Sequence, residues 1–343
     1  MKLNIRVVAA LVAAGITVAL TGTALAAHVW TAGTPIPDPD GAAGPGTGAT
    51  EGTCAGEFGN RIYVAFGFDS GIGDTALLRV YDVAKDTWSF GPNAPAPMRS
   101  EGYQGVAHGG KLYCMGGRSA GPLADLDSFD PASNTWTSLA SMTQARAGTA
   151  AAGQGNALYV FGGRTTTAPT PPACAGVITP SAAGTTILRY DIDTDTWSNA
   201  GNLTVSRSDA TAARIGDKIY IFGGCGTAGM LNSIEVYDPK TQMSTLFAGV
   251  TLPTARALMA AATAGNEVHL TGGVNSLPDN YLVFNAVKGT VTAGTPFPTS
   301  CPAGVPRAEH SSVAHGNRLY VIGGACPFAG TSRAQLDILK LSP

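Results

Sequence analysis

The stretch Ile219-Tyr220-Ile221-Phe222-Gly223-Gly224, an apolar run that ends in a pair of glycines, recurs along this chain of 343 residues. Five further copies, the last of them degenerate with a single glycine, occupy residues 112–117, 158–163, 268–273, 319–324 and 62–67. In chain order, the final glycines of successive copies lie 50, 46, 61, 49 and 51 residues apart. Self-similarity near 50 residues indicates a repeat architecture in which each copy is one supersecondary unit.

Each repeat reads as four short strands. The first begins at an arginine and runs through small residues, as in 207–213, and the second ends at the glycine pair. Its alternating large apolar side chains suit a strand that is packed on both faces. The third ends in an aromatic residue followed by Asp or Asn, as in Tyr190-Asp191. The fourth opens seven residues after that aromatic with Trp88, Trp136 or Trp197, and the fourth and fifth copies carry Ser244 and Val291 there.

This combination of motifs resembles the kelch family of β-propellers, and the resemblance covers essentially everything after residue 26. It implies an all-β fold, namely a six-bladed kelch β-propeller of four-stranded antiparallel blades. Residues 336–340 match a third strand, and the segment around Trp30 matches a fourth strand. Residues 27–34 are therefore expected to complete the blade formed by residues 307–343. Such sharing closes the ring and removes its open edges.

The first 26 residues have the character of a signal peptide. Lys2 and Arg6 precede the mostly apolar residues 7–20, and Ala24-Leu25-Ala26 supplies small residues for cleavage. We expect a mature chain of residues 27–343 that forms one propeller domain, is secreted or periplasmic, and has no membrane span. The alternative is an uncleaved anchor, although the apolar stretch is short for a full span.

Composition argues against several classes of function. Charged residues make up 13% of the chain, the formal net charge is −2, and no basic stripe is present, so nucleic-acid binding is not expected. The cysteines form no C-x-x-C pair, and one histidine beside one carboxylate is not a metal site. No phosphate-binding glycine loop and no nucleophile elbow occur. We therefore expect neither a metal nor a cofactor.

Six cysteines in an exported chain indicate three disulfides, for which fifteen connectivities are possible. In a kelch propeller the loops between second and third strands share one face with the connections between blades. The long segments 35–52, 164–184 and 294–306 would lie there, together with four of the cysteines. The resemblance thus implies Cys174–Cys225 and Cys301–Cys326, which leaves Cys54–Cys114, and a role in stapling long loops.

The arginine at the start of each first strand is the main candidate for ligand binding. Arg146, Arg207, Arg256 and Arg307 stand 13 residues before the Tyr or His of the second strand, and Arg99 stands 14 before Tyr113. Three of them have an acid two residues further on: Glu101, Asp209 and Glu309. A spacing of two would place arginine and acid on the same face of a strand. His310 follows Glu309 and is expected to approach the channel.

Two interpretations of these residues remain open. They could form a ring of guanidinium and carboxylate groups at the channel mouth that binds an acidic sugar or an acidic peptide. Alternatively, each arginine could bond neighbouring backbone carbonyls and serve the blade itself. A pocket of about 300 Å³ or more lined by the arginines would favour a small ligand. Buried arginines below an apolar loop face would favour a protein partner.

The sequence favours a monomeric, non-catalytic binding module that recognises a protein or carbohydrate partner through its long-loop face. The first alternative is a sugar mutarotase or epimerase, because the periplasmic sialic-acid mutarotases resemble this chain in size, export and blade number. Arg99 with Glu101, or Arg307 with Glu309, could supply the general acid–base pair that such an enzyme needs. The second alternative is a purely structural module in a surface assembly.

Overall fold

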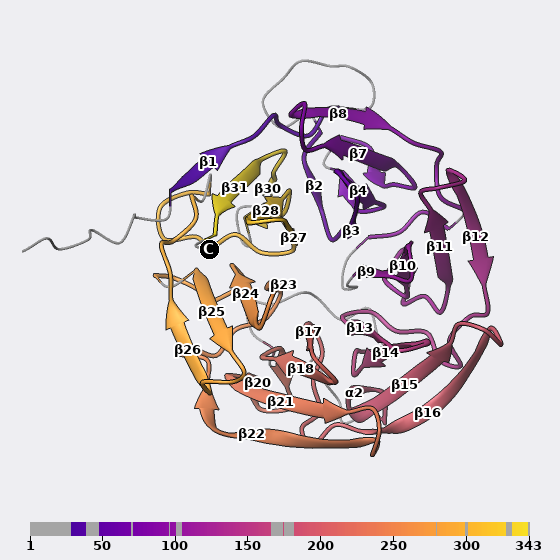
Figure 1. Ribbon diagram of the computed structural model, residues 1–343, viewed down its shortest axis with the longest axis vertical. Helices are drawn as coiled ribbons and strands as arrows, with labels where there is room; N and C mark the ends of the chain where they lie inside the picture. The colour runs from indigo at the N-terminus through magenta and orange to yellow at the C-terminus, as the bar shows by residue number, and fades with distance from the viewer. Residues whose placement is uncertain are drawn as a thin grey trace, which may run out of the picture.

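Figure 1 shows the computed structural model of the protein, which describes residues 29–38, 48–69, 71–95, 97–100, 105–165, 174, 182–278, 280–298, 301–326 and 331–341. The expected signal peptide and the candidate residue Glu101 lie outside the described residues. Apart from the short helix α2 (Ala182–Thr185), the regular elements of the described part are β-strands. The all-β fold is therefore confirmed.

Within the described residues the longer strands form six four-stranded antiparallel sheets, which we number along the chain. Sheet 1 contains β3 (Cys54–Phe58), β4 (Arg61–Ala65), β7 (Leu78–Asp82) and β8 (Thr87–Phe90). Sheet 2 contains β9 (Val106–His108), β10 (Lys111–Met115), β11 (Leu126–Asp130) and β12 (Thr135–Leu139). Sheet 3 contains β13 (Ala150–Gln154), β14 (Ala157–Phe161), β15 (Thr186–Asp191) and β16 (Thr196–Asn202).

The other three sheets have the same order of strands. Sheet 4 contains β17 (Thr211–Ile215), β18 (Lys218–Phe222), β21 (Ser233–Asp238) and β22 (Met243–Thr251). Sheet 5 contains β23 (Ala260–Ala264), β24 (Glu267–Thr271), β25 (Tyr281–Asn285) and β26 (Thr290–Ala293). Sheet 6 contains β27 (Ser311–His315), β28 (Arg318–Ile322), β31 (Leu336–Lys340) and the N-terminal β1 (Trp30–Ala32), which pairs with β31 in the register Trp30↔Leu339.

The sheets are arranged around a common centre, with the first strand of each innermost and the fourth outermost (Figure 1). One face carries the connections between second and third strands and between successive sheets, and we call it the long-loop face. Three small sheets form there, from β2 (Thr50–Glu51), β5 (Phe68–Asp69) and β6 (Gly73–Asp74), from β19 (Cys225–Gly226) and β20 (Gly229–Met230), and from β29 (Ala325–Cys326) and β30 (Thr331–Ser332). The opposite face, with the tight turns, is the turn face.

Each second strand packs against both neighbouring sheets. In β4, Ile62 and Val64 join the buried cluster shared with sheet 6, whereas Tyr63 and Ala65 join the cluster shared with sheet 2. Successive side chains of a strand point to opposite faces, so an apolar run can fill two interfaces at once. The apolar runs before the glycine pairs therefore form the core between sheets, as the sequence predicts.

The glycine pair and the arginine are connected across neighbouring sheets. The N–H of Gly163 in sheet 3 donates to the carbonyl oxygen of Arg207, which leads into sheet 4, at 3.0 Å. The same bond joins Gly224 to Arg256 at 2.9 Å and Gly273 to Arg307 at 2.9 Å. Both glycines of each complete pair have positive φ, and a β-carbon at Gly162 would overlap the Arg207 oxygen. The repeat therefore needs glycine where the next sheet approaches.

The four tryptophans make one kind of contact. Each lies on the fourth strand of its sheet and donates its indole N–H to a backbone oxygen that follows the fourth strand of the preceding sheet. The bonds measure 2.7–2.9 Å and join Trp30 to Thr295, Trp88 to Thr34, Trp136 to Pro92 and Trp197 to Ala140. In sheet 4, where Ser244 replaces tryptophan, the hydroxyl of Tyr237 donates to Ala200 O at 2.8 Å.

The three disulfides pair as the sequence analysis expects, Cys54–Cys114, Cys174–Cys225 and Cys301–Cys326. Cys174–Cys225 and Cys301–Cys326 lie at the long-loop face, where they tie long segments to β19 and β29. Cys54–Cys114 has a different place from the one we expected. It joins β3 to β10, and both residues belong to the buried cluster between sheets 1 and 2, so it is a core crosslink rather than a loop staple.

Candidate functional site

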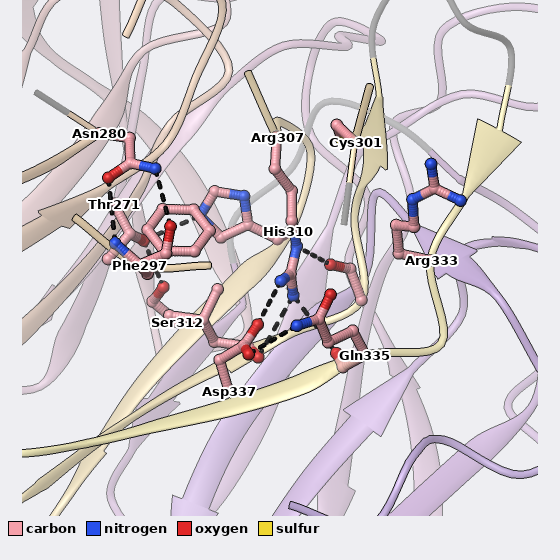
Figure 2. Close-up of polar contacts among 12 residues, drawn as sticks. Thr271, Asn280, Phe297, Cys301, Arg307, His310, Ser312, Arg333, Gln335 and Asp337 are labelled. Carbon is pink, nitrogen blue, oxygen red and sulfur yellow. Dashed lines mark hydrogen bonds and ion pairs between the residues drawn. The ribbon is translucent and has the colours of Figure 1, made fainter. Parts of the chain in front are cut away.

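The repeated arginines lie inside the sheets and not at the channel mouth. The residues Arg99, Arg146, Arg207, Arg256 and Arg307 are all between 0 and 2% exposed. Figure 2 shows Arg307 directed toward Asp337 and Gln335, within sheet 6. A guanidinium that is fully buried presents no surface to a ligand. Of the two interpretations left open by the sequence, the ring of arginines at the channel mouth therefore does not hold, because these side chains are buried within the sheets.

Backbone oxygens are common partners of these arginines. Arg307 Nε donates to Gly323 O at 2.6 Å, and Arg207 Nη1 donates to Gly223 O at 2.7 Å. Gly323 and Gly223 are the first glycines of their pairs. Arg146 makes the same contact with Gly162 O at 3.1 Å, and Arg99 reaches Cys114 O at 3.3 Å. Arg256 Nε donates to Thr254 O at 3.4 Å, and its Nη2 donates to Thr254 Oγ1 at 2.6 Å.

Three of the arginines also pair with an acid on the third strand of their own sheet. The pairs are Arg99–Asp127 at 2.6 Å, Arg207–Glu235 at 2.8 Å and Arg307–Asp337 at 2.5 Å. Burial raises the pKa of Asp127 and of Asp337, although the guanidinium beside each opposes this shift. In sheets 3 and 5 the equivalent third-strand positions hold Leu188 and Leu282. Burial lowers the pKa of Arg146 to about 10.

The residue two places after the arginine does not have the extended backbone that we predicted. Asp209 and Glu309 have φ of 53° and 57°, in the left-handed region, as has Leu258 at 58°. Arginine and acid therefore do not share a strand face. Each of these residues is hydrogen-bonded through its backbone to the residue at the equivalent position of a neighbouring sheet. The bonds are Asp209 N to Gly148 O at 2.7 Å, Leu258 N to Asp209 O at 2.9 Å, Glu309 N to Leu258 O at 3.1 Å and Gly52 N to Glu309 O at 2.8 Å.

This chain of backbone bonds links five of the six sheets and lies along the wall of the central cavity that opens toward the long-loop face. The cavity, here the loop-face cavity, has a volume of about 90 Å³. Of the predicted site residues, Asp209, Glu309 and His310 line it together. Asp209 is 5% exposed, forms an ion pair with Arg164, and accepts a bond from Ser208 Oγ at 2.6 Å. A volume of this size admits only a few atoms, well below the roughly 300–1,000 Å³ of typical ligand pockets.

His310 is buried between sheets 5 and 6. Its Nε2 lies 2.8 Å from Thr271 Oγ1, which lies 2.6 Å from Ser312 Oγ (Figure 2). Burial, with a smaller contribution from the charge of Arg307, lowers the pKa of His310 to about 3. The imidazole is therefore neutral at physiological pH, and it acts as a packed polar group at the cavity wall.

A second and larger central cavity opens at the turn face. This turn-face cavity has a volume of about 500 Å³ and is lined by the first strands of all six sheets. Glu57, His108 and Arg214 are its charged or titratable lining residues. None of the three, and not Arg164, is among the site residues expected from the sequence. The position of Glu57 and Arg214 one residue before the end of a first strand could have indicated this location.

Two further findings concern the described residues. Across the described ranges, no cluster of three or more His, Cys, Asp or Glu side chains has an arrangement suited to a metal ion. No helix in the described part of the chain has the length and apolar character needed to cross a membrane.

Comparison with known proteins agrees with the repeat. A family model described as the KLHDC2/KLHL20/DRC7 Kelch-repeats domain matches residues 142–324, and one described as the Kelch motif matches residues 102–143. Together with the four-stranded sheets and their glycine–arginine bonds, these matches define a repeat protein of the propeller class. The chain belongs to the kelch-repeat family.

Several curated proteins are similar to this chain. Kelch-like protein 25 of Xenopus tropicalis is 26% identical over 269 residues, which cover 75% of this chain and 42% of that protein. Alpha-scruin of Limulus polyphemus is 28% identical over 174 residues, 49% of this chain and 18% of that protein. Kelch repeat protein M-T8 of Myxoma virus is 32% identical over 141 residues, 40% of this chain and 26% of that protein. The chain thus spans less than half the length of these relatives.

Proposed function

We propose that the six sheets are the blades of a closed propeller, in which β1 completes the blade of β27, β28 and β31. Contacts between sheet 6 and sheet 1 support closure: Thr53 Oγ1 lies 2.7 Å from Ser311 Oγ, and Gly324 N donates to Thr50 O at 2.7 Å. Removal of residues 27–34 tests this proposal. A closed ring predicts a large loss of thermal stability and rescue by a synthetic peptide of those residues, and unchanged stability would contradict it.

We further propose that this exported, monomeric propeller binds a protein partner through its long-loop face. The observation that carries the proposal is a group of exposed apolar side chains, Phe68, Ile72 and Met98, at 37, 57 and 56% exposure. They lie on neighbouring segments of that face, because Gly67 N donates to Arg99 O and Arg99 N to Thr75 O. Clustered apolar side chains on a surface favour contact with another protein.

The buried arginines support a protein partner over a small acidic ligand. The loop-face cavity is small, and its wall contains none of the five arginines. For the mutarotase alternative, the pair of Arg307 with Glu309 is unsuitable, since Arg307 is fully buried against Asp337. A carbohydrate partner has no equivalent support at this face. Protein binding without catalysis is therefore the function that the geometry favours.

Affinity capture with matched variants tests the binding face. The mature chain, residues 27–343, serves as bait in the native envelope or medium, followed by crosslinking mass spectrometry. We expect the double variant Ile72→Asp/Met98→Asp to lose the captured partner. The control is Val287→Asp, which changes an even more exposed apolar residue (79%) in a turn of sheet 5 on the turn face. Retention by the double variant, or equal loss in the control, would contradict the assignment of the long-loop face.

Export has its own test. Cell fractionation and N-terminal sequencing of the protein from its native source should give a secreted or periplasmic chain that starts at Ala27. A chain that retains residues 1–26 in the membrane fraction would support the anchor alternative instead.

A further inference from the structure

The disulfide Cys301–Cys326 differs from the other two in its access to solvent. Cys326 is 1% exposed, whereas Cys301 is partly exposed and the residues that follow it, 302–304, are exposed. A thiol in solvent therefore approaches this bond from the side of Cys301. The remaining four cysteines lie deeper, at 0–3% exposure: Cys54, Cys114, Cys174 and Cys225.

A guanidinium group lies against the buried end of this bond. Arg333 Nε donates to Cys326 Sγ at 3.0 Å. The backbone of Arg333 is fixed on both sides, because its N–H donates to Gly324 O at 2.7 Å and its C=O accepts from Thr50 N at 3.2 Å. Among the hydrogen bonds of the described residues, the contact with Cys326 is the one that joins a charged side chain to a cysteine sulfur.

The charge of Arg333 is not balanced by a carboxylate within the described part of the chain. Figure 2 shows its side chain directed away from Asp337, which pairs with Arg307. Burial lowers the pKa of Arg307, the carboxylate of Asp337 opposes this shift, and the charge of Arg333 adds to it. The two guanidinium groups are therefore close enough to repel each other. A thiolate on Cys326 would offset this repulsion, and an adjacent cation stabilises a thiolate.

We propose that Cys301 is a site of reversible S-thiolation by a low-molecular-weight thiol, with Cys326 as the leaving group and Arg333 as the residue that stabilises the departing thiolate. The incoming thiol loses its proton to water, and its thiolate forms a disulfide with Cys301 Sγ. The Cys301–Cys326 bond breaks, and its electron pair stays on Cys326 Sγ. A leaving thiol of lower pKa departs faster, so exposure and charge both favour attack at Cys301. In the reverse step the Cys326 thiolate displaces the thiol and restores the bond.

This exchange unties a loop and leaves the sheets closed. Phe297, earlier in the same segment, is held independently: its N–H donates to Asn280 Oδ1 at 3.1 Å, and its C=O accepts from Asn280 Nδ2 at 3.0 Å. Its ring lies against Trp30 and His310, at centroid distances of 5.6 and 5.7 Å. The stretch that is released therefore lies between Phe297 and Arg307, at the long-loop face. The chemistry does not depend on the protein interaction proposed for that face.

Incubation of the folded mature chain with reduced glutathione near neutral pH tests the site. Free thiols are trapped with N-ethylmaleimide in denaturant after increasing times, and peptide mapping by mass spectrometry locates the glutathione. We expect glutathione on Cys301 and a free thiol on Cys326. The disulfides Cys54–Cys114 and Cys174–Cys225 should stay closed over the same period.

Substitution of the arginine tests its role. Arg333→Met removes the guanidinium and should slow the opening by about three- to tenfold, because Cys326 becomes a poorer leaving group. Arg333→Lys keeps the charge and should retain most of the rate. The matched control is Arg318→Met, an exposed arginine at the turn-face end of β28 in the same sheet, which should react like the parent. Thermal unfolding establishes that each variant is folded.

A second measurement addresses the thiolate directly and does not depend on how freely the loop moves. In Cys301→Ser, Cys326 is the single cysteine outside a disulfide, and the ultraviolet absorbance of its thiolate follows its titration. Adding Arg333→Met to this variant should raise the pKa of the Cys326 thiol by about one pH unit, because the cation is gone. An unchanged pKa would contradict the role of Arg333.

Three further results would overturn the proposal. They are glutathione on Cys326 instead of Cys301, opening of Cys301–Cys326 no faster than that of the other two disulfides, and equal opening rates for Arg333→Met and the parent. None of them bears on capture of a protein partner, so this site and the proposed interaction stand or fall separately.

Discussion

Sheets 3 and 4 are neighbours with the same strand order, yet they surround the repeated arginine with different chemistry. In sheet 4, Arg207 faces the carboxylate of Glu235, and both side chains have no exposed surface. In sheet 3, the place of that acid is taken by Leu188, and Arg146 donates to backbone oxygens. The repeat therefore fixes where the guanidinium lies and leaves open what balances its charge.

The two sheets also differ at the outer edge, and the differences are connected. Trp197 in sheet 3 donates to Ala140 O of the preceding sheet, whereas sheet 4 has Ser244 at that position. Ser244 Oγ donates to Glu235 Oε1 at 2.9 Å. The serine that replaces the tryptophan thus supplies a hydroxyl that hydrogen-bonds the buried carboxylate of Glu235. The comparison teaches that substitutions within one repeat compensate each other locally, around a backbone common to all repeats.

The largest effect should follow from making sheet 4 resemble sheet 3. Glu235→Leu leaves the charge of Arg207 buried without its carboxylate and should lower the free energy of unfolding by about 3–5 kcal/mol. Leucine is sterically acceptable at this position, as Leu188 shows, so the loss would report charge and not shape. Urea denaturation under non-reducing conditions measures it.

The control for this substitution is Asp217→Asn, which removes an exposed ion pair with Lys240. Solvent screens such a pair, so the urea midpoint should not move. A Glu235→Leu midpoint equal to that of the parent would show that Arg207 needs only backbone oxygens, and the distinction between the two sheets would disappear.

Removing the arginine itself should again separate the two sheets. Arg207→Met leaves the buried carboxylate of Glu235 without its guanidinium, whereas Arg146→Met leaves the oxygens of Gly162 and Thr186 without that donor. A buried charge costs more than an uncharged acceptor, so Arg207→Met should be the more destabilising change by about 2 kcal/mol. Parallel urea denaturation gives the comparison, and equal losses in the two variants would contradict it.

Between sheets 5 and 6 the buried polar group is His310, which is neutral, in contrast to the charged groups of sheets 3 and 4. The pKa of His310 is lowered to about 3, below its ordinary value of 6.5. As pH falls through 6.5, the unfolded chain takes up a proton at this position and the folded chain does not. The stability that neutral His310 contributes is complete above pH 6.5 and is lost below it, by up to about 1.4 kcal/mol per pH unit.

Substitution of His310 separates its contribution to the pH dependence of stability from the contributions of carboxylates that titrate in the same pH range. We expect His310→Gln to lose stability between about pH 6.5 and pH 5 less steeply than the parent, because glutamine takes up no proton. Urea denaturation at both pH values gives the two slopes. Parallel slopes for parent and variant would show that His310 is protonated in the folded protein.

The repeat makes much of this fold predictable from sequence, but only part of the candidate site. Strand order and packing follow from local periodicity, which the glycine pairs mark clearly. The backbone of Asp209 and Glu309 was predicted wrongly, because their positive φ depends on bonds to neighbouring sheets. A signal was present, since Gly52 and Gly148 occupy the same place in other repeats. The turn-face cavity was missed because its charged residues occur in single repeats.

The smallest effect should come from the two bonds that tie sheets 3 and 4 to their preceding sheets. Trp197→Phe removes the donor to Ala140 O, which is partly accessible to water, and should cost about 1 kcal/mol. Tyr237→Phe leaves the fully buried Ala200 O without its hydroxyl donor and should cost somewhat more, about 1–2 kcal/mol. If thermal unfolding ranks the two variants in the opposite order, Tyr237 does not replace the missing tryptophan of sheet 4. The only compensation in that sheet would then be the bond of Ser244 to Glu235.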